Sequence, residues 1–175
     1  SQLSSQMSLE LFYAFSSHSF TRSSMGWLHE KKMHFCMCAG SEPFCIFGDQ
    51  QQLIMQPSAL LFPGMAAGIK YQGPSNSYYW LPSVMNFPGI DGVLGHERDI
   101  YTLQASTAAD HGAPLDGILR IWDAVSPEVQ KQCTWHFVVI ADDERTAETL
   151  RAKFAKQLVN VQVWGCNLNE HQPNL

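Results

Sequence analysis

A change of hydrophobic period near residue 115 constrains the fold of this chain more than any other feature. Pro114 opens a helical spacing of apolar residues, which predicts an amphipathic helix packed on a core. The apolar residues are Leu115, Ile118, Leu119, Trp122 and Val125. A β-branched and aromatic run at 135–140, a second helical pattern after Asp142 or Asp143, and a last strand near 161–164 follow. Strand, helix, strand in this order implies right-handed parallel crossovers in a mixed sheet flanked by helices.

The first half of the chain predicts one helix followed by several short strands. The helix begins after Ser23 or Ser24 and runs to about Cys38, with Gly40 as its stop. Apolar runs at 44–47, 53–55, 59–62 and 78–81 are typical of an antiparallel meander, and 90–94 and 100–106 predict two more strands. We therefore expect an α/β sandwich of αβββαβ order, with residues 1–22 as a leading segment and residues 23–175 as a single domain.

Composition supports a packed core and gives no bulk support for nucleic-acid binding. The 175 residues are 45% hydrophobic and 15% charged, which is the balance of a globular chain. The formal net charge is -5, whereas nucleic-acid binders usually carry a basic face. A local basic cluster remains open, and its candidate residues are Lys31, Lys32 and Lys70.

The five cysteines favour reduced, buried thiols over a disulfide framework. His34, Cys36, Cys38 and Cys45 lie close in sequence, but only one residue separates Cys36 from Cys38, and no second pair follows. Structural zinc sites usually separate paired cysteines by two to four residues. His34 and His136 lie in apolar runs and are predicted to be core histidines with satisfied polar atoms.

Neither a membrane span nor a targeting segment is predicted. No run of about eighteen apolar residues occurs, and residues 1–20 lack the basic start and apolar stretch of a signal peptide. The sequence begins without Met, so it can be a fragment, and its localisation cannot be read.

The candidate chemistry lies where two predicted strands begin and end. Asp91 follows the Pro88-Gly89 turn at the start of one strand, and Gln104 and Ser106 share one face of the next by alternation. If these strands pair, Asp91 approaches Gln104. A carboxylate and an amide carbonyl are both oxygen ligands suited to Mg²⁺, although a turn Asp beside a polar strand edge would give the same pattern.

These elements resemble the restriction-endonuclease-like PD-(D/E)XK domains of crinkler effectors and retrotransposon-hot-spot proteins. The likeness covers roughly residues 25–165, and it rests on the order and spacing of the motifs. The motifs are Gly26 to Glu30 on the first helix, Pro88-Gly89-Ile90-Asp91, Leu103-Gln104-Ala105-Ser106, His111 before the next helix, and the apolar strand ending at Ile140.

The resemblance implies a site that binds one or two Mg²⁺ or Mn²⁺ ions. Asp91 would be the principal ligand, Gln104 a second ligand through its carbonyl, and Glu30 would approach from the first helix. Such ions polarise a scissile phosphate and activate water. Glu30 is equally well explained as a solvated acid beside Lys31 and Lys32.

The chain departs from the family pattern at two site positions. Gln104 stands where the family has an acid, and Ser106 stands where it has a lysine. Losing one well-placed electrostatic group commonly costs about 10² to 10³ in rate. His111 or Lys31 could take over the missing role, although His111 could also be an ordinary residue at a helix start.

Two functions follow from the resemblance. One is a metal-dependent nuclease with DNA as the expected substrate, serving as the toxic part of an effector in a host nucleus. The other is a nuclease fold without catalysis that binds nucleic acid or a host protein. Asp142, Asp143 and Glu144 could mimic an acidic metal cluster but fit a helix start better. Residues 126–129 likewise predict a capped turn of helix that begins at Ser126.

Overall fold

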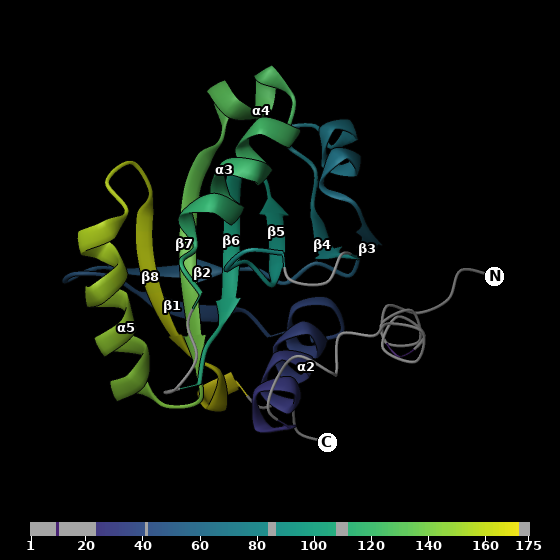
Figure 1. Ribbon diagram of the computed structural model, residues 1–175. Helices are drawn as coiled ribbons and strands as arrows, with labels where there is room; N and C mark the ends of the chain where they lie inside the picture. Colours follow the sequence, from purple (N-terminus) through teal and green to yellow (C-terminus); the bar gives the residue numbers. More distant parts are fainter. Residues whose placement is uncertain (1–9, 11–23, 41, 84–86, 108–111, 172–175) are drawn as a thin grey trace.

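The computed structural model describes residue 10 and residues 24–40, 42–83, 87–107 and 112–171 (Figure 1). Within these ranges the chain forms an eight-stranded sheet of order β2-β1-β8-β7-β6-β5-β4-β3. Its strands are β1 (Phe44–Phe47), β2 (Gln52–Met55), β3 (Leu61–Gly64), β4 (Tyr78–Pro82), β5 (Gly92–His96), β6 (Asp99–Ala105), β7 (Thr134–Ala141) and β8 (Gln162–Asn167). The helices are α2 (Ser24–Cys38), α3 (Leu115–Ala124), α4 (Pro127–Gln132), α5 (Glu144–Gln157) and the 3₁₀ helices η2 (Ala66–Tyr71) and η3 (Leu168–His171).

The predicted parallel crossovers are confirmed in the centre of the sheet. β6 pairs parallel with β7, and β7 pairs parallel with β8. Helices α3 and α4 connect the first pair, and α5 connects the second. β7 is buried along nearly its whole length, as expected for a β-branched strand covered on both faces.

Helices cover both faces of this α/β sheet. On one face, α2 contributes Met33 and Met37 to a core that includes Leu103 and Ala105 of β6. On the other face, α3 contributes Ile118 and α5 contributes Phe154 to a second core. Because side chains alternate along a strand, Gln104 and Ser106 point away from the α2 face.

The predicted antiparallel meander of the first strands is wrong. β1 and β2 form a hairpin, but β1 then pairs with β8 at the far side of the sheet. β3 pairs parallel with β4, because η2 supplies a connection long enough for the chain to return in the same direction. Phe44 and Ile46 of β1 are buried in the α2-side core, which holds the hairpin beside β8.

Helix α3 forms where predicted but buries a different stripe of residues. Ile118, Ile121 and Val125 are buried, whereas Leu115, Leu119 and Trp122 are 48%, 49% and 37% exposed. Gly117 sets this rotation, since a Cβ there would lie 2.1 Å from the Pro88 carbonyl oxygen. The close approach of the two backbones turns the 118–121–125 side towards the sheet.

Several smaller predictions are confirmed. The Asp143 carboxylate accepts a hydrogen bond from Thr146 N at 2.7 Å and caps α5, so the acids at 142–144 are a helix start. The Ser126 hydroxyl caps α4 in the same way. All five cysteines are free thiols as expected, although Cys45 and Cys133 are only partly buried. Burial raises the pKa of Cys38 and of Cys166 to about 12.

The remaining expectations concern the leading segment and a membrane span. Apart from Glu10, the predicted leading segment 1–22 lies outside the described residues. Within the described ranges, no helix combines the length and apolar character needed to cross a membrane.

Candidate functional site

Strand pairing brings Asp91 to the end of β6. β5 and β6 pair antiparallel with Gly92 opposite Leu103, and Asp91 N donates to the Leu103 carbonyl at 2.8 Å. The Asp91 carboxylate turns back onto the same strand, where Oδ2 accepts a hydrogen bond from Ala105 N at 2.8 Å. Asp91 thus lies beside Gln104, as the predicted pairing of the two strands requires.

The Gln104 amide is engaged at both of its ends. Nε2 donates to the carbonyl oxygens of Gly89 at 2.8 Å and Gly112 at 3.0 Å. Oε1 accepts a hydrogen bond from the Ser106 hydroxyl at 2.9 Å. We name Asp91, Gln104 and Ser106 the Gln104 cluster; their exposed fractions are 6%, 3% and 0%.

The Gln104 cluster connects three segments of backbone. It holds the turn before β5 through Gly89, the end of β6 through Ala105 and Ser106, and the approach to α3 through Gly112. The turn also packs tightly, because Gly89 has φ +68° and a Cβ there would lie 2.5 Å from the Ala113 carbonyl oxygen. We call this arrangement a staple, because its side-chain hydrogen bonds join the ends of two strands to the start of a helix.

Of the two remaining predicted site residues, the structure describes Glu30, which lies apart from this cluster. Glu30 lies on α2, and its Oε1 is 3.3 Å from Nε2 of the buried His34. The other ring nitrogen of His34 bonds to the Tyr79 hydroxyl. α2 packs on the face of β6 opposite to Gln104, so the structure does not bring Glu30 into the predicted shell. His111 lies outside the described residues.

The sequence analysis missed the contact of Glu30 with His34 and that of His34 with Tyr79. His34 follows Glu30 at i,i+4 on α2, a spacing that places both side chains on one helix face and could have been noticed. Tyr79 belongs to a distant strand, and its hydroxyl packs where a Cβ on Gly92 would lie only 2.5 Å away. No local signal predicts that contact.

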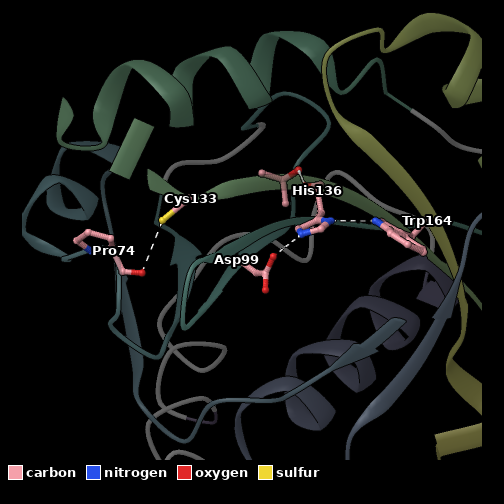
Figure 2. A network of polar contacts seen from close by, with 6 residues as sticks. Pro74, Asp99, Cys133, His136 and Trp164 are labelled. Carbon is pink, nitrogen blue, oxygen red and sulfur yellow. Dashed lines mark hydrogen bonds and ion pairs between the residues drawn. The ribbon is translucent and has the colours of Figure 1, made fainter. Parts of the chain in front are cut away.

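A second buried polar network lies at the other end of β6 (Figure 2). His136 Nε2 is 2.7 Å from Asp99 Oδ1, and Trp164 Nε1 donates to His136 Nδ1 at 3.0 Å. The indole can only donate, so Nδ1 is the acceptor and Nε2 carries the proton that is donated to Asp99. The His136 ring stacks on Tyr101 with centroids 4.6 Å apart.

The Asp99–His136 network pairs a carboxylate with an imidazole, as a general base does, but no nucleophile in the described part of the chain hydrogen-bonds to the ring. Burial lowers the pKa of His136 below its ordinary value of 6.5, although the hydrogen bond that its Nε2 donates to Asp99 acts in the opposite direction. The nitrogen that could accept a proton from a nucleophile faces an indole instead. We interpret the network as a core histidine with satisfied polar atoms, as the sequence predicted for His136 and also for His34.

The donors of the Gln104 cluster fit a divalent metal poorly. The cluster contains one carboxylate, that of Asp91, and its amide carbonyl already accepts the Ser106 hydroxyl. Lys31, a candidate for the missing lysine, has its Nζ 5.2 Å from the centre of the Trp27 ring. Across the described part of the chain, no three His, Cys, Asp or Glu side chains gather to hold a metal ion.

The comparisons with known proteins found no relative of this chain. No family model, no curated protein and no solved structure matches the chain. Any function must therefore be inferred from the arrangement of the described side chains.

Proposed function

We propose that this chain is a restriction-endonuclease-like domain that works by binding a partner and not by cleaving phosphodiesters. The order of α2, β4, β5, β6, α3 and β7 supports the αβββαβ assignment. Asp91, just before β5, and Gln104, near the end of β6, are the residues to which the family resemblance gives the role of metal ligands. The proposal therefore retains the nuclease fold but not metal-dependent phosphodiester cleavage.

The observation that carries this proposal is the saturation of the Gln104 side chain. Its two N–H groups and its carbonyl are all hydrogen-bonded to protein, and the residue is 3% exposed. Binding a metal through Oε1 would require the Ser106 bond to break or share, and a neutral amide attracts a cation less than a carboxylate does. Ser106 cannot supply the positive charge of the family lysine, so nothing in the cluster stabilises a phosphate in the transition state.

A second candidate is a Mg²⁺- or Mn²⁺-dependent nuclease acting on DNA. The observation in its favour is that Asp91 and Gln104 lie side by side at adjoining strand ends. Asp91 and the Gln104 carbonyl would hold the ion, which would supply Lewis-acid chemistry when bound. Asp91 would also position the end of β6 through Ala105 N.

Cleavage of plasmid and single-stranded DNA in Mg²⁺ or Mn²⁺ separates the two candidates. The variants are Asp91→Asn, which keeps an acceptor for Ala105 N, and the matched exposed control Asp123→Asn. We expect no cleavage above background from any of the three proteins. Metal-dependent cutting by wild type and Asp123→Asn that disappears in Asp91→Asn would overturn the proposal in favour of the nuclease.

A further inference from the structure

A groove lies between η2 and α3. Phe87, on the segment that leads into Asp91, also lines it. Its volume is about 550 Å³, which is in the range of natural ligand pockets. The apolar part of the lining consists of Met65, Phe87 and three alanines, and Met65 is 65% exposed. We name it the η2–α3 groove.

Phe87 forms one wall of the groove, and three alanines form its floor. Phe87 is backed by the fully buried Trp80, with ring centroids 5.5 Å apart in an edge-to-face arrangement. Three residues separate Phe87 from Asp91, and Gln104 binds the intervening turn through the Gly89 carbonyl. The floor alanines, Ala66, Ala67 and Ala124, are small and leave space for a bulky side chain from a partner.

The polar rim carries more positive than negative charge. Lys70 and Arg120 contribute two cations and Asp123 one anion. Among the described residues, Arg120 and Asp123 form no hydrogen bond or ion pair, so both can pair with a partner. Lys70 lies 4.9 Å from the centre of the Tyr71 ring, and that ring is 77% exposed.

We propose that the η2–α3 groove docks a segment of a partner protein that carries a bulky apolar side chain flanked by acidic residues. The apolar side chain would cover the alanine floor and Phe87, while carboxylates would pair with Lys70 and Arg120. Nucleic acid fits less well, because Asp123 would repel phosphates and the floor is apolar. The inference rests on the proposed function, since it names the partner class of a module without catalysis.

The test is selection from a phage-displayed library of random peptides on the full chain, followed by fluorescence anisotropy with the enriched peptides. Three variants accompany the wild type: Ala67→Trp to fill the floor, Lys70→Glu with Arg120→Glu to reverse the rim, and Lys156→Glu as an exposed control on α5. All substituted positions are exposed, so the variants should unfold at the wild-type urea midpoint.

We expect enriched peptides to combine an aromatic or large aliphatic residue with neighbouring Asp or Glu. Their affinity should fall at least about tenfold in Ala67→Trp and in the charge reversal, and stay unchanged in Lys156→Glu. No enrichment, enrichment without acids, or binding that survives Ala67→Trp would overturn the proposal. So would single-stranded DNA binding that Ala67→Trp abolishes. Asp91-dependent cleavage would refute the absence of catalysis without altering peptide binding, so the two proposals fail separately.

Discussion

The two ends of β6 carry polar networks of opposite character. At the end of the strand, the Gln104 cluster is built around a neutral amide that binds main-chain carbonyls. At its start, the Asp99–His136 network is built around a titratable ring held between an acid and an indole. The end that the sequence suggested for chemistry is a backbone staple, and the pair that resembles a catalytic dyad is a core contact.

The comparison shows why residue type alone does not identify a site. Asp91 and Asp99 are both acids, and they lie at opposite ends of the β5–β6 hairpin. Asp91 is 6% exposed and accepts from a main-chain N–H, whereas the Asp99 side chain is 38% exposed and accepts from a ring. Burial and the identity of the hydrogen-bond partners decide what each carboxylate can do.

The largest effect is expected for Gln104→Leu. The substitution leaves the Ser106 hydroxyl without its partner in a buried site, and the carbonyls of Gly89 and Gly112 without theirs in a partly buried one. Unpaired buried groups cost about 1 to 3 kcal/mol each, so the free energy of unfolding should fall by about 3 kcal/mol or more. Urea titration measures it.

Gln130→Leu is the control for this change, because Gln130 Nε2 also donates to a backbone carbonyl, at 2.7 Å, but on the surface. Its cost should stay below about 1 kcal/mol. Equal losses in the two variants would show that the Gln104 cluster is not a staple.

Asp91→Ala should give the next largest loss. It leaves Ala105 N without its side-chain acceptor beside a buried strand end, at an expected cost of about 2 kcal/mol. Asp91→Asn retains an acceptor and should lose less than about 1 kcal/mol. If both variants lose the same amount by urea titration, the negative charge and not the hydrogen bond stabilises the site.

At the start of β6, we expect His136 to make the free energy of unfolding depend on pH. Because burial holds the pKa of folded His136 below 6.5, the unfolded chain takes up a proton at a higher pH than the folded chain. The stability that neutral His136 contributes is present above pH 6.5 and is lost as the pH falls towards the folded-state pKa.

Urea midpoints above and below pH 6.5 measure this loss, with His136→Asn as the reference. Asn keeps an acceptor near the Nδ1 position but does not titrate, so the variant should show a flatter pH profile. An identical profile in wild type and variant would assign the pH dependence to other histidines.

The smallest effect is expected for Thr102→Val. The Thr102 hydroxyl donates to the His136 carbonyl at 2.8 Å, and valine conserves the shape of the side chain. The loss should be about 0.5 to 1 kcal/mol. Thr149→Val is the matched control, since its hydroxyl donates to the Arg145 carbonyl on the surface at 2.9 Å. A Thr102→Val loss above that of Asp91→Ala would reverse the ranking of the two ends.

Local patterns predicted the parts of the fold that depend on neighbouring residues. The helix at Leu115, the buried strand ending at Ile140 and the cap at Asp143 all follow from spacing and residue type. The meeting of Asp91 with Gln104 was predictable because a short turn joins β5 to β6 and alternation sets the faces.

Long-range pairing was not predictable from those patterns. Nothing local places Phe47 opposite Gly165, since the two lie 118 positions apart in sequence. The partners of His136 come from two different strands, and the exposed side of α3 depends on the approach of Gly117 to Pro88. In the candidate site, the saturation of Gln104 depends on Gly89 and Gly112, whose backbone positions only the folded chain defines.

The most direct test of the non-catalytic account is the effect of Mn²⁺ on the free energy of unfolding of wild type and Asp91→Asn. A ligand that binds only the folded state raises its stability, and this readout needs no knowledge of the substrate. The account predicts that Mn²⁺ shifts the urea midpoints of the two proteins equally or not at all. Stabilisation of wild type that is absent in Asp91→Asn would show a metal site at Asp91 and contradict it.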